Sequence, residues 1–182
     1  RKESSAASDV YKRQFLDRDI DDFDNVTPEE AISHPIWKMG NKISVDSSTM
    51  MNKCLEIIEA RWLFDIVDIE VLIHPEGVVH SIVEFTDNSM LAQMSVPDMK
   101  IPIAYGLGFP ERIISGSESI NLDTLRTLTF RKPDYNKFPA LKLAKESIKE
   151  GGTSFAILNA ANEECVEAVS YTHLRAHETK AN

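Results

Sequence analysis

The sequence has few of the features that mark several common classes of protein. It contains only two cysteines, Cys54 and Cys165, without metal-binding spacing, so we expect a reducing compartment rather than a disulfide framework or a zinc site. No apolar run has the length of a transmembrane helix, and no signal-peptide pattern is present. The net charge of −9, without a Lys/Arg cluster, argues against nucleic acid as a partner. We therefore expect a cytoplasmic protein that binds neither membranes nor nucleic acids.

Hydrophobic periodicity predicts a mixture of helices and strands. Helices are expected over residues 27–32, 48–64, 101–107, 139–149 and 155–168, and strands over 67–73, 78–85, 90–94 and 125–130. The first helix should have Thr27 as its N-cap and Pro28 in its first turn, and the polar turn 86–89 should join two strands as an antiparallel hairpin. This order predicts an α/β fold, in which a mixed α+β sheet layer with helices is followed by a truncated helical region.

The helix expected over residues 48–64 carries an unusual polar stripe. Three of its side chains, Asn52, Lys53 and Glu56, lie on one face together with Thr49, and nearly all of the remaining positions are apolar. A mostly buried helix must either pair such groups internally or present them to a polar cleft. Spacing alone leaves both interpretations open, since Lys53 and Glu56 could equally form an ordinary surface ion pair.

The segment that leads into this helix favours an anion site. Residues 46–49 offer several possible N-caps, and the first turn of a helix presents unpaired N–H groups and the positive end of its dipole. A serine hydroxyl from this segment, the amide of Asn52 and the ammonium of Lys53 would suit a phosphate monoester. Glu56, one turn deeper, is better placed to hold a divalent cation or to act as a base.

The residues just upstream of the polar stripe are typical of a lid. Pro35 restricts His34 to an extended conformation, Trp37 and Met39 supply large adaptable apolar surfaces, and Gly40 gives a backbone capable of hinge motion. The alternative is a loop whose tryptophan simply fills the core. Two further histidines, at positions 74 and 80, flank a Pro-Glu-Gly turn and could either bind a metal or hold turn carbonyls in place.

These motifs together resemble one enzyme family. The run HPIWKMGNKISVDSSTMMNKCLE from His34, followed by EVLIHPEGVVHSIVEF from Glu70, LAQMSVPDMKIPIAY from Leu91 and LNAANEECVEA from Leu158, resembles the 1-deoxy-D-xylulose 5-phosphate reductoisomerase family in the same order. The resemblance covers residues 15–168. It implies a bacterial cytoplasmic enzyme of the non-mevalonate isoprenoid pathway that acts on 1-deoxy-D-xylulose 5-phosphate with NADPH and Mg or Mn.

The resemblance also assigns roles to individual residues. It implies that Ser47, Asn52 and Lys53 form part of a phosphate pocket, with His34 also in contact with substrate, and that Glu56 binds at the substrate site as one ligand of the metal. The same resemblance places Trp37 and Met39 in a loop that closes over the substrate, and Gly40 near the nicotinamide cofactor.

Other parts of the family pattern are not found in this sequence. The glycine-rich dinucleotide-binding domain and an upstream Asp-Ser-Glu segment with two more metal-binding carboxylates are missing. Residues 1–14 and 169–182 resemble translated sequencing adapters, so we expect both to be non-native tails. Between them, we expect 15–130 to be part of a catalytic α/β domain and 131–168 to be a linker and the start of a C-terminal helical domain.

We therefore expect a fragment that is inactive alone, from an enzyme that forms homodimers. Two alternatives remain open at this point: a non-catalytic association module, which would pair through exposed strand edges, or a metal-dependent sugar-phosphate isomerase or lyase that needs no nicotinamide.

Overall fold

The computed structural model describes residues 4–9, 15–33 and 40–178. The chain forms two compact units. The sheet unit consists of Arg1–Tyr11 and Asp68–Pro133, and the helical unit consists of Lys12–Val67 and Asp134–Asn182. The helices before residue 67 pack with those after residue 134, which accounts for the composition of the helical unit. None of the helices in the described ranges combines the length and the hydrophobicity that crossing a membrane requires.

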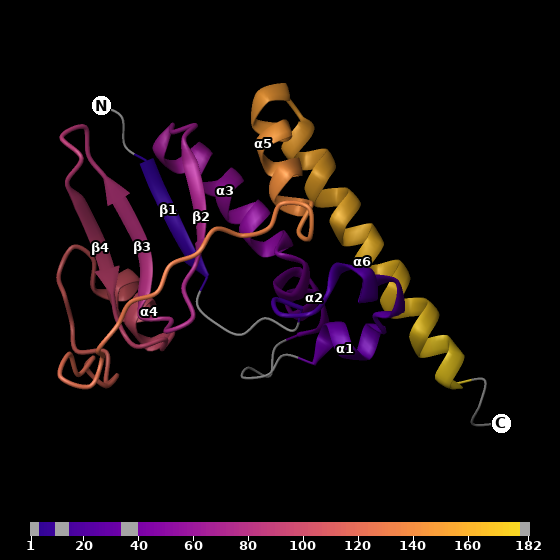
Figure 1. Cartoon of the computed structure of the whole chain (residues 1–182), viewed down its shortest axis with the longest axis horizontal. Helices are drawn as coiled ribbons and strands as arrows, with labels where there is room; N and C mark the ends of the chain where they lie inside the picture. The colour runs from indigo at the N-terminus through magenta and orange to yellow at the C-terminus, as the bar shows by residue number, and fades with distance from the viewer. Residues whose placement is uncertain (1–3, 10–14, 34–39, 179–182) are drawn as a thin grey trace. The chain divides into compact units, whose positions relative to one another are not determined.

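Among the residues that the structure describes, the sheet unit contains four strands in the order β2-β1-β3-β4 (Figure 1). They are β1 (Ser4–Asp9), β2 (Ile69–Ile73), β3 (Val79–Glu84) and β4 (Met90–Met94). Strand β1 pairs in parallel with β2 and antiparallel with β3, and β3 pairs antiparallel with β4. Ile69, Val71 and Ile73 of β2 are buried on one face, as alternation along a strand requires. The expected class, a mixture of helices with a small sheet, is confirmed.

Strand β1 lies within residues 1–14, which we expected from the sequence to be a non-native tail. Residues 4–9, SSAASD, form an inner strand between β2 and β3. Backbone N–H and C=O groups form the ladder whatever the side chains are, so a small polar sequence with weak strand propensity can still occupy an inner position.

The hairpin of β3 and β4 is confirmed, and the N–H of Phe85 donates to the carbonyl of Ser89 across its turn at 2.9 Å. Helix α4 (Lys100–Gly108) follows the hairpin, as expected. The strand predicted over 125–130 is wrong. Within the described residues this segment belongs to no strand, and the nearest pairing is an isolated bridge between Ile73 and Arg131. The N–H and the carbonyl of Thr129 contact the side chains of Glu76 and His74 instead of a strand.

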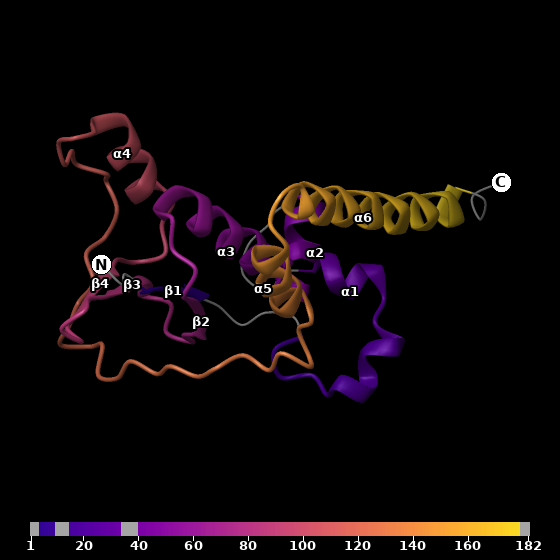
Figure 2. The same cartoon turned by 90° about the horizontal axis from the view of Figure 1, so that it is seen from above.

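In its described residues, the helical unit contains a 3-10 helix and five α-helices (Figures 1 and 2). They are η1 (Ile20–Asn25), α1 (Pro28–Ile32), α2 (Asn41–Thr49), α3 (Met51–Phe64), α5 (Ala140–Glu150) and α6 (Ser154–Glu178). Thr27 caps α1 in a capping box with Glu30, which confirms the predicted start. The core includes Cys54 and Ile57 of α3 with Leu141 of α5. Helix α6 continues ten residues beyond its predicted end at residue 168. Its last part therefore lies in residues 169–182, the second segment that we expected to be a non-native tail.

The single helix predicted over 48–64 is wrong, because the chain forms two helices that meet at Met50. This residue has φ of 60° and ψ of 17°, a left-handed conformation that ends α2 and begins α3. Its side chain is completely buried. Burial of a large apolar side chain at the corner offsets the cost of a positive φ, which no local signal in the sequence reveals.

Candidate active site

The corner between α2 and α3 is held by two hydroxyl side chains. Ser48 and Thr49 both donate to the carbonyl of Val45, at 2.8 and 3.0 Å. The Thr49 hydroxyl also accepts a hydrogen bond from the N–H of Met51 at 3.3 Å, at the start of α3. One hydroxyl therefore connects the last turn of α2 with the first turn of α3, and the angle between the helices is fixed locally.

Ser47 lies in the last turn of α2 and is 9% exposed. The expectation that residues 46–48 cap the following helix is wrong, since all three belong to the preceding one. Thr49 satisfies the first N–H of α3 instead, and the N–H groups of Lys53 and Cys54 donate to the Met50 carbonyl. Ser47 consequently belongs to a separate helix and does not cap α3.

The polar stripe of α3 forms a compact cluster. The ammonium of Lys53 donates to Oε2 of Glu56 at 2.7 Å, and the side-chain amide of Asn52 donates to Oε1 of the same carboxylate at 3.4 Å. The Lys53 side chain is only 9% exposed, whereas that of Glu56 is 39% exposed. The polar groups of the stripe are thus paired with one another, as one of the two interpretations expected. Lys53 and Glu56 do not form an ordinary surface ion pair, because the ammonium of Lys53 is buried.

Two groups in this cluster could meet a bound ligand, a buried cation and an unsatisfied hydrogen-bond acceptor. Lys53 brings a positive charge to a site with little water, where electrostatic attraction is strong. The carbonyl oxygen Oδ1 of Asn52 is buried and has no hydrogen-bond partner within the described part of the chain. A buried acceptor of this kind costs free energy unless a donor meets it, so a hydroxyl-bearing ligand would satisfy it.

The described residues alone do not form a complete metal site. Within them, no three His, Cys, Asp or Glu side chains gather closely enough to hold an ion. Hard cations such as Mg²⁺ take six or so oxygen ligands, and Glu56 supplies a single carboxylate whose charge is already balanced by Lys53. Glu56 therefore fits as one ligand of a larger set, and no chemical step follows from this carboxylate by itself.

The remaining predicted residues of the upstream segment are only partly described. His34, Trp37 and Met39 lie outside the described residues. Gly40 is the N-cap of α2, with φ of −61°, and its carbonyl accepts the N–H of Ser44 at 3.1 Å. A Cβ at position 40 would meet nothing within 4 Å. Neither backbone conformation nor crowding within the described residues requires glycine there.

The histidines of the sheet unit hold carbonyl groups, as the second interpretation expected. Nδ1 of His74 lies 2.8 Å from the carbonyl oxygen of Thr129, and Nε2 of His80 lies 3.0 Å from that of Ser95. His74 is fully buried and stacks on Phe130 with 4.7 Å between ring centroids. His74 and His80 thus connect the segments around Thr129 and Ser95 to the sheet.

Sequence reasoning missed the role of Asp46. It was considered only as a helix cap, but it is a buried carboxylate that accepts hydrogen bonds from Lys42 of α2 and Asn162 of α6. The Lys42 contact could have been found from its i, i+4 spacing. The contact with Asn162 spans 116 residues, and only the tertiary structure reveals it.

Comparison with protein families gives two matches. The model described as "1-deoxy-D-xylulose 5-phosphate reductoisomerase C-terminal domain" matches residues 9–64, and that described as "DXP reductoisomerase C-terminal domain" matches residues 94–176. Together they cover well over half of the chain, including the α2–α3 corner and most of α6.

Similar sequences carry the same description. The chain is 54% identical over 156 residues to the 1-deoxy-D-xylulose 5-phosphate reductoisomerase of Nitrosococcus oceani, which covers 85% of the chain and 40% of that protein. It is 52% identical over 169 residues to that of Ralstonia pickettii, covering 92% of the chain and 43% of the relative. The chain thus spans about two fifths of the length of these relatives.

Solved structures agree with the sequence matches. A DOX-P reductoisomerase in complex with NADPH, fosmidomycin and magnesium superposes with a TM-score of 0.84 at 47% identity, over 93% of this chain and 42% of that one. The enzyme of Zymomonas mobilis in complex with NADPH gives 0.82 at 45% identity, over 91% of this chain and 43% of that one.

Proposed function

Since the chain belongs to the 1-deoxy-D-xylulose 5-phosphate reductoisomerase family, we propose that it is part of an enzyme that converts 1-deoxy-D-xylulose 5-phosphate to 2-C-methyl-D-erythritol 4-phosphate. The reaction rearranges the carbon skeleton of a ketose phosphate and then reduces it with NADPH, in the presence of Mg or Mn. The buried Lys53, held at the α2–α3 corner beside Asn52, is the observation that carries this proposal.

The proposed phosphate grip consists of Ser47 from α2 and of Asn52 and Lys53 from α3, with His34 also in contact with the substrate. The ammonium of Lys53 now faces Glu56 at 2.7 Å. A phosphate dianion carries more charge than one carboxylate and would compete for that ammonium. Glu56 would then be released to serve as one metal ligand. In the same proposal, Trp37 and Met39 close over the substrate and exclude water, and Gly40 lies near the nicotinamide.

We further propose that the 182-residue chain alone has no turnover. Glu56 supplies one carboxylate, and the relatives are more than twice as long as the region matched here. The test is NADPH oxidation with 1-deoxy-D-xylulose 5-phosphate, measured for this chain and for the protein from a gene extended in both directions. We expect activity from the longer protein only. Turnover by the isolated chain would contradict its inactivity, and an inactive longer protein would contradict the proposed function.

Lys53→Gln in the longer protein gives a sharper test of the site. We expect a much higher KM for the sugar phosphate and an unchanged KM for NADPH, because the ammonium contacts only the phosphate in this proposal. Glu59→Gln on the exposed side of the same helix is the matched control. If Lys53→Gln and the unsubstituted protein had equal KM values for the sugar phosphate, Lys53 would not be part of the phosphate grip.

We propose self-association into a homodimer as a second candidate function, in an enzyme of the bacterial cytoplasm. The exposed edge of the sheet favours self-association. Strand β4 ends the strand order, and all five of its residues are exposed, including Met90 at 66% and Leu91 at 64%. An exposed apolar edge strand is a ready surface for pairing with a second chain. Sedimentation at several concentrations should show a dimer that Leu91→Lys weakens and Ile157→Lys, on α6, does not. A strictly monomeric folded chain would count against it.

A further inference from the structure

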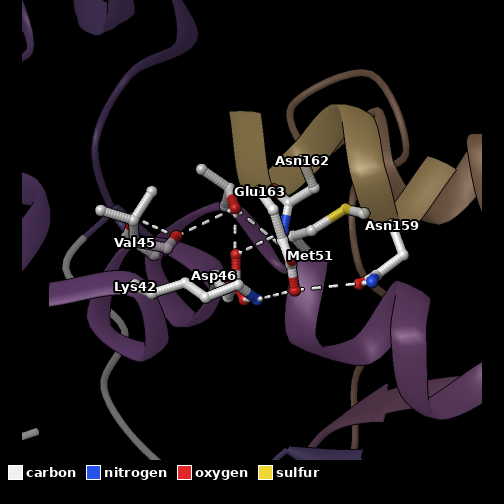
Figure 3. Close-up of polar contacts among 9 residues, drawn as sticks. Lys42, Val45, Asp46, Met51, Asn159, Asn162 and Glu163 are labelled. Carbon is white, nitrogen blue, oxygen red and sulfur yellow. Dashed lines mark hydrogen bonds and ion pairs between the residues drawn. The ribbon is translucent and has the colours of Figure 1, made fainter. Parts of the chain in front are cut away.

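Asp46 is placed where two helices meet. It lies on α2, directly before Ser47, and its side chain is 6% exposed. Its Oδ2 accepts a hydrogen bond from Nζ of Lys42 at 2.9 Å, one turn earlier on α2. Its Oδ1 accepts one from Nδ2 of Asn162 on α6, also at 2.9 Å (Figure 3). Both oxygens of a buried carboxylate are thus satisfied, each by a different helix.

The contacts around Asp46 form a chain of polar groups between α2 and α6. Lys42 also lies 4.0 Å from Oε1 of Glu163, and that oxygen is 3.5 Å from Nδ2 of Asn159 (Figure 3). We call Lys42, Asp46, Asn159, Asn162 and Glu163 the α2–α6 clamp. Its outer contacts are long, and Glu163 is 58% exposed, so they contribute little. The short bonds to the buried Asp46 are the strong ones, because they involve an ionised acceptor away from water.

The clamp adjoins the α2–α3 corner. The Thr49 hydroxyl, which accepts the N–H of Met51, donates to the carbonyl of Val45 and lies 3.4 Å from that of Asp46. Any shift of Asp46 therefore moves the last turn of α2, including Ser47, relative to the first turn of α3. Asn52 and Lys53 are in that first turn.

The charge of Asp46 also reaches α3 directly. Burial, and after it the negative charge of Asp46, raises the pKa of the Cys54 thiol to about 12. The electrostatic effect of the Asp46 carboxylate therefore extends to Cys54, the residue that follows Lys53, in a region where little water screens the charge.

We propose that Asp46 and Asn162 are positioning residues, which hold Ser47 in register with Asn52 and Lys53 so that α6 sets the geometry of the phosphate grip. This inference rests on the proposed function, in that the grip is taken to bind a phosphate ester. The two residues touch neither the phosphate nor the reacting atoms. They act through the backbone of the corner.

The test compares variants of the longer protein by calorimetry with inorganic phosphate and by steady-state kinetics. Asp46→Asn places an amide against the ammonium of Lys42, and Asn162→Asp places a second carboxylate against Asp46. For each variant we expect a dissociation constant for phosphate and a KM for the sugar phosphate about tenfold higher, with an unchanged KM for NADPH. The double variant Asp46→Asn with Asn162→Asp exchanges donor and acceptor, and should recover most of the loss. Glu164→Gln, exposed on α6, is the control.

The outcomes separate positioning from stability alone. Single variants that lower the melting temperature but leave phosphate affinity unchanged would overturn the inference. If Asp46→Asn fails to fold, Asn162→Ala removes the same bond at a half-buried site, and its phosphate affinity decides in the same way. Phosphate binding that depends on Asp46 in a protein without reductoisomerase activity would refute the proposed function and support the inference, because calorimetry needs no turnover.

Discussion

The ammonium of Lys53 lies 2.7 Å from Oε2 of Glu56, and the cation is the more buried partner, at 9% against 39% side-chain exposure. A buried ammonium needs an opposite charge nearby, because transfer of an unpaired ion from water into the protein interior is costly. Glu56 therefore stabilises this region by compensating the charge of Lys53. In the proposed function, a bound phosphate ester would supply the same compensation.

Glu56→Gln should lower the free energy of unfolding by about 1–2 kcal/mol, less than for a fully buried pair because Glu56 is partly exposed. Urea denaturation of the chain measures it. The additional change Lys53→Met removes the uncompensated charge, so we expect the double variant to recover part of the loss. Glu59→Gln is the control for helix propensity and net charge. Equal stability of Glu56→Gln and the unsubstituted chain would show that solvent already compensates Lys53.

Cys54 and Cys165 should react with thiol reagents at very different rates. Burial and the charge of Asp46 raise the pKa of Cys54 from 9.0 to about 12, which lowers its thiolate fraction about a thousandfold near neutral pH. Cys165 is exposed. Titration of the native chain with an aromatic disulfide reagent should therefore give one fast thiol, and the second only after unfolding. A fast phase that persists in Cys165→Ser would contradict this assignment.

Position 88 should tolerate glycine better than alanine. Asn88 has φ of 65° in the turn between β3 and β4, and its N–H donates to the Phe85 carbonyl at 2.9 Å. Asn88→Gly should stabilise the chain by about 0.5 kcal/mol and Asn88→Ala should destabilise it by about 1 kcal/mol, because a Cβ disfavours the left-handed region. Thermal and urea denaturation of the two variants provide matched measurements. The opposite order would exclude backbone conformation as the determinant of this turn.

Stability should fall in acid partly through Glu76. Burial raises the pKa of Glu76, but hydrogen bonds from Thr129 and the charge of His74 together outweigh it and hold the pKa below 4.5. A depressed pKa in the folded state contributes stability above the unfolded value, and this stability is lost as the pH falls through the folded value. The unfolding free energy should therefore decline less between about pH 5 and pH 3 in Glu76→Gln. Exposed Glu118→Gln serves as the control, and equal slopes for both variants would contradict the assignment.

Local patterns predicted several elements correctly. The capping box of Thr27 and Glu30, the hairpin around the turn 86–89 and helix α4 all depend on neighbouring residues, whose hydrogen bonds and periodicity the sequence displays directly. The predicted strand over 125–130 failed for a different reason. Strands β2 and β4 both stand at the ends of the strand order, but the N–H and the carbonyl of Thr129 contact the side chains of Glu76 and His74 instead. These contacts span more than 50 residues, and local strand propensity does not reveal them.

The proposed phosphate grip shows the same division within a few residues. Spacing placed Asn52, Lys53 and Glu56 on one helical face, and the structure confirms that they meet there. Spacing also predicted one continuous helix capped by residues 46–49, but Met50 interrupts it with a left-handed conformation. The roles of all these residues, and of Ser47 and Gly40, at the substrate, the metal and the cofactor stay predictions.

The amino-acid sequence by itself determined the family, the polar stripe of α3 and most of the local elements, because these follow from residue identity and from contacts within about two turns of a helix. Only the tertiary structure decided that Met50 turns the corner, that Lys53 is buried, and that Asp46 is held by Asn162 from 116 residues away. The physical reason is that burial and long-range pairing depend on which surfaces come together, and local propensity has no access to that information.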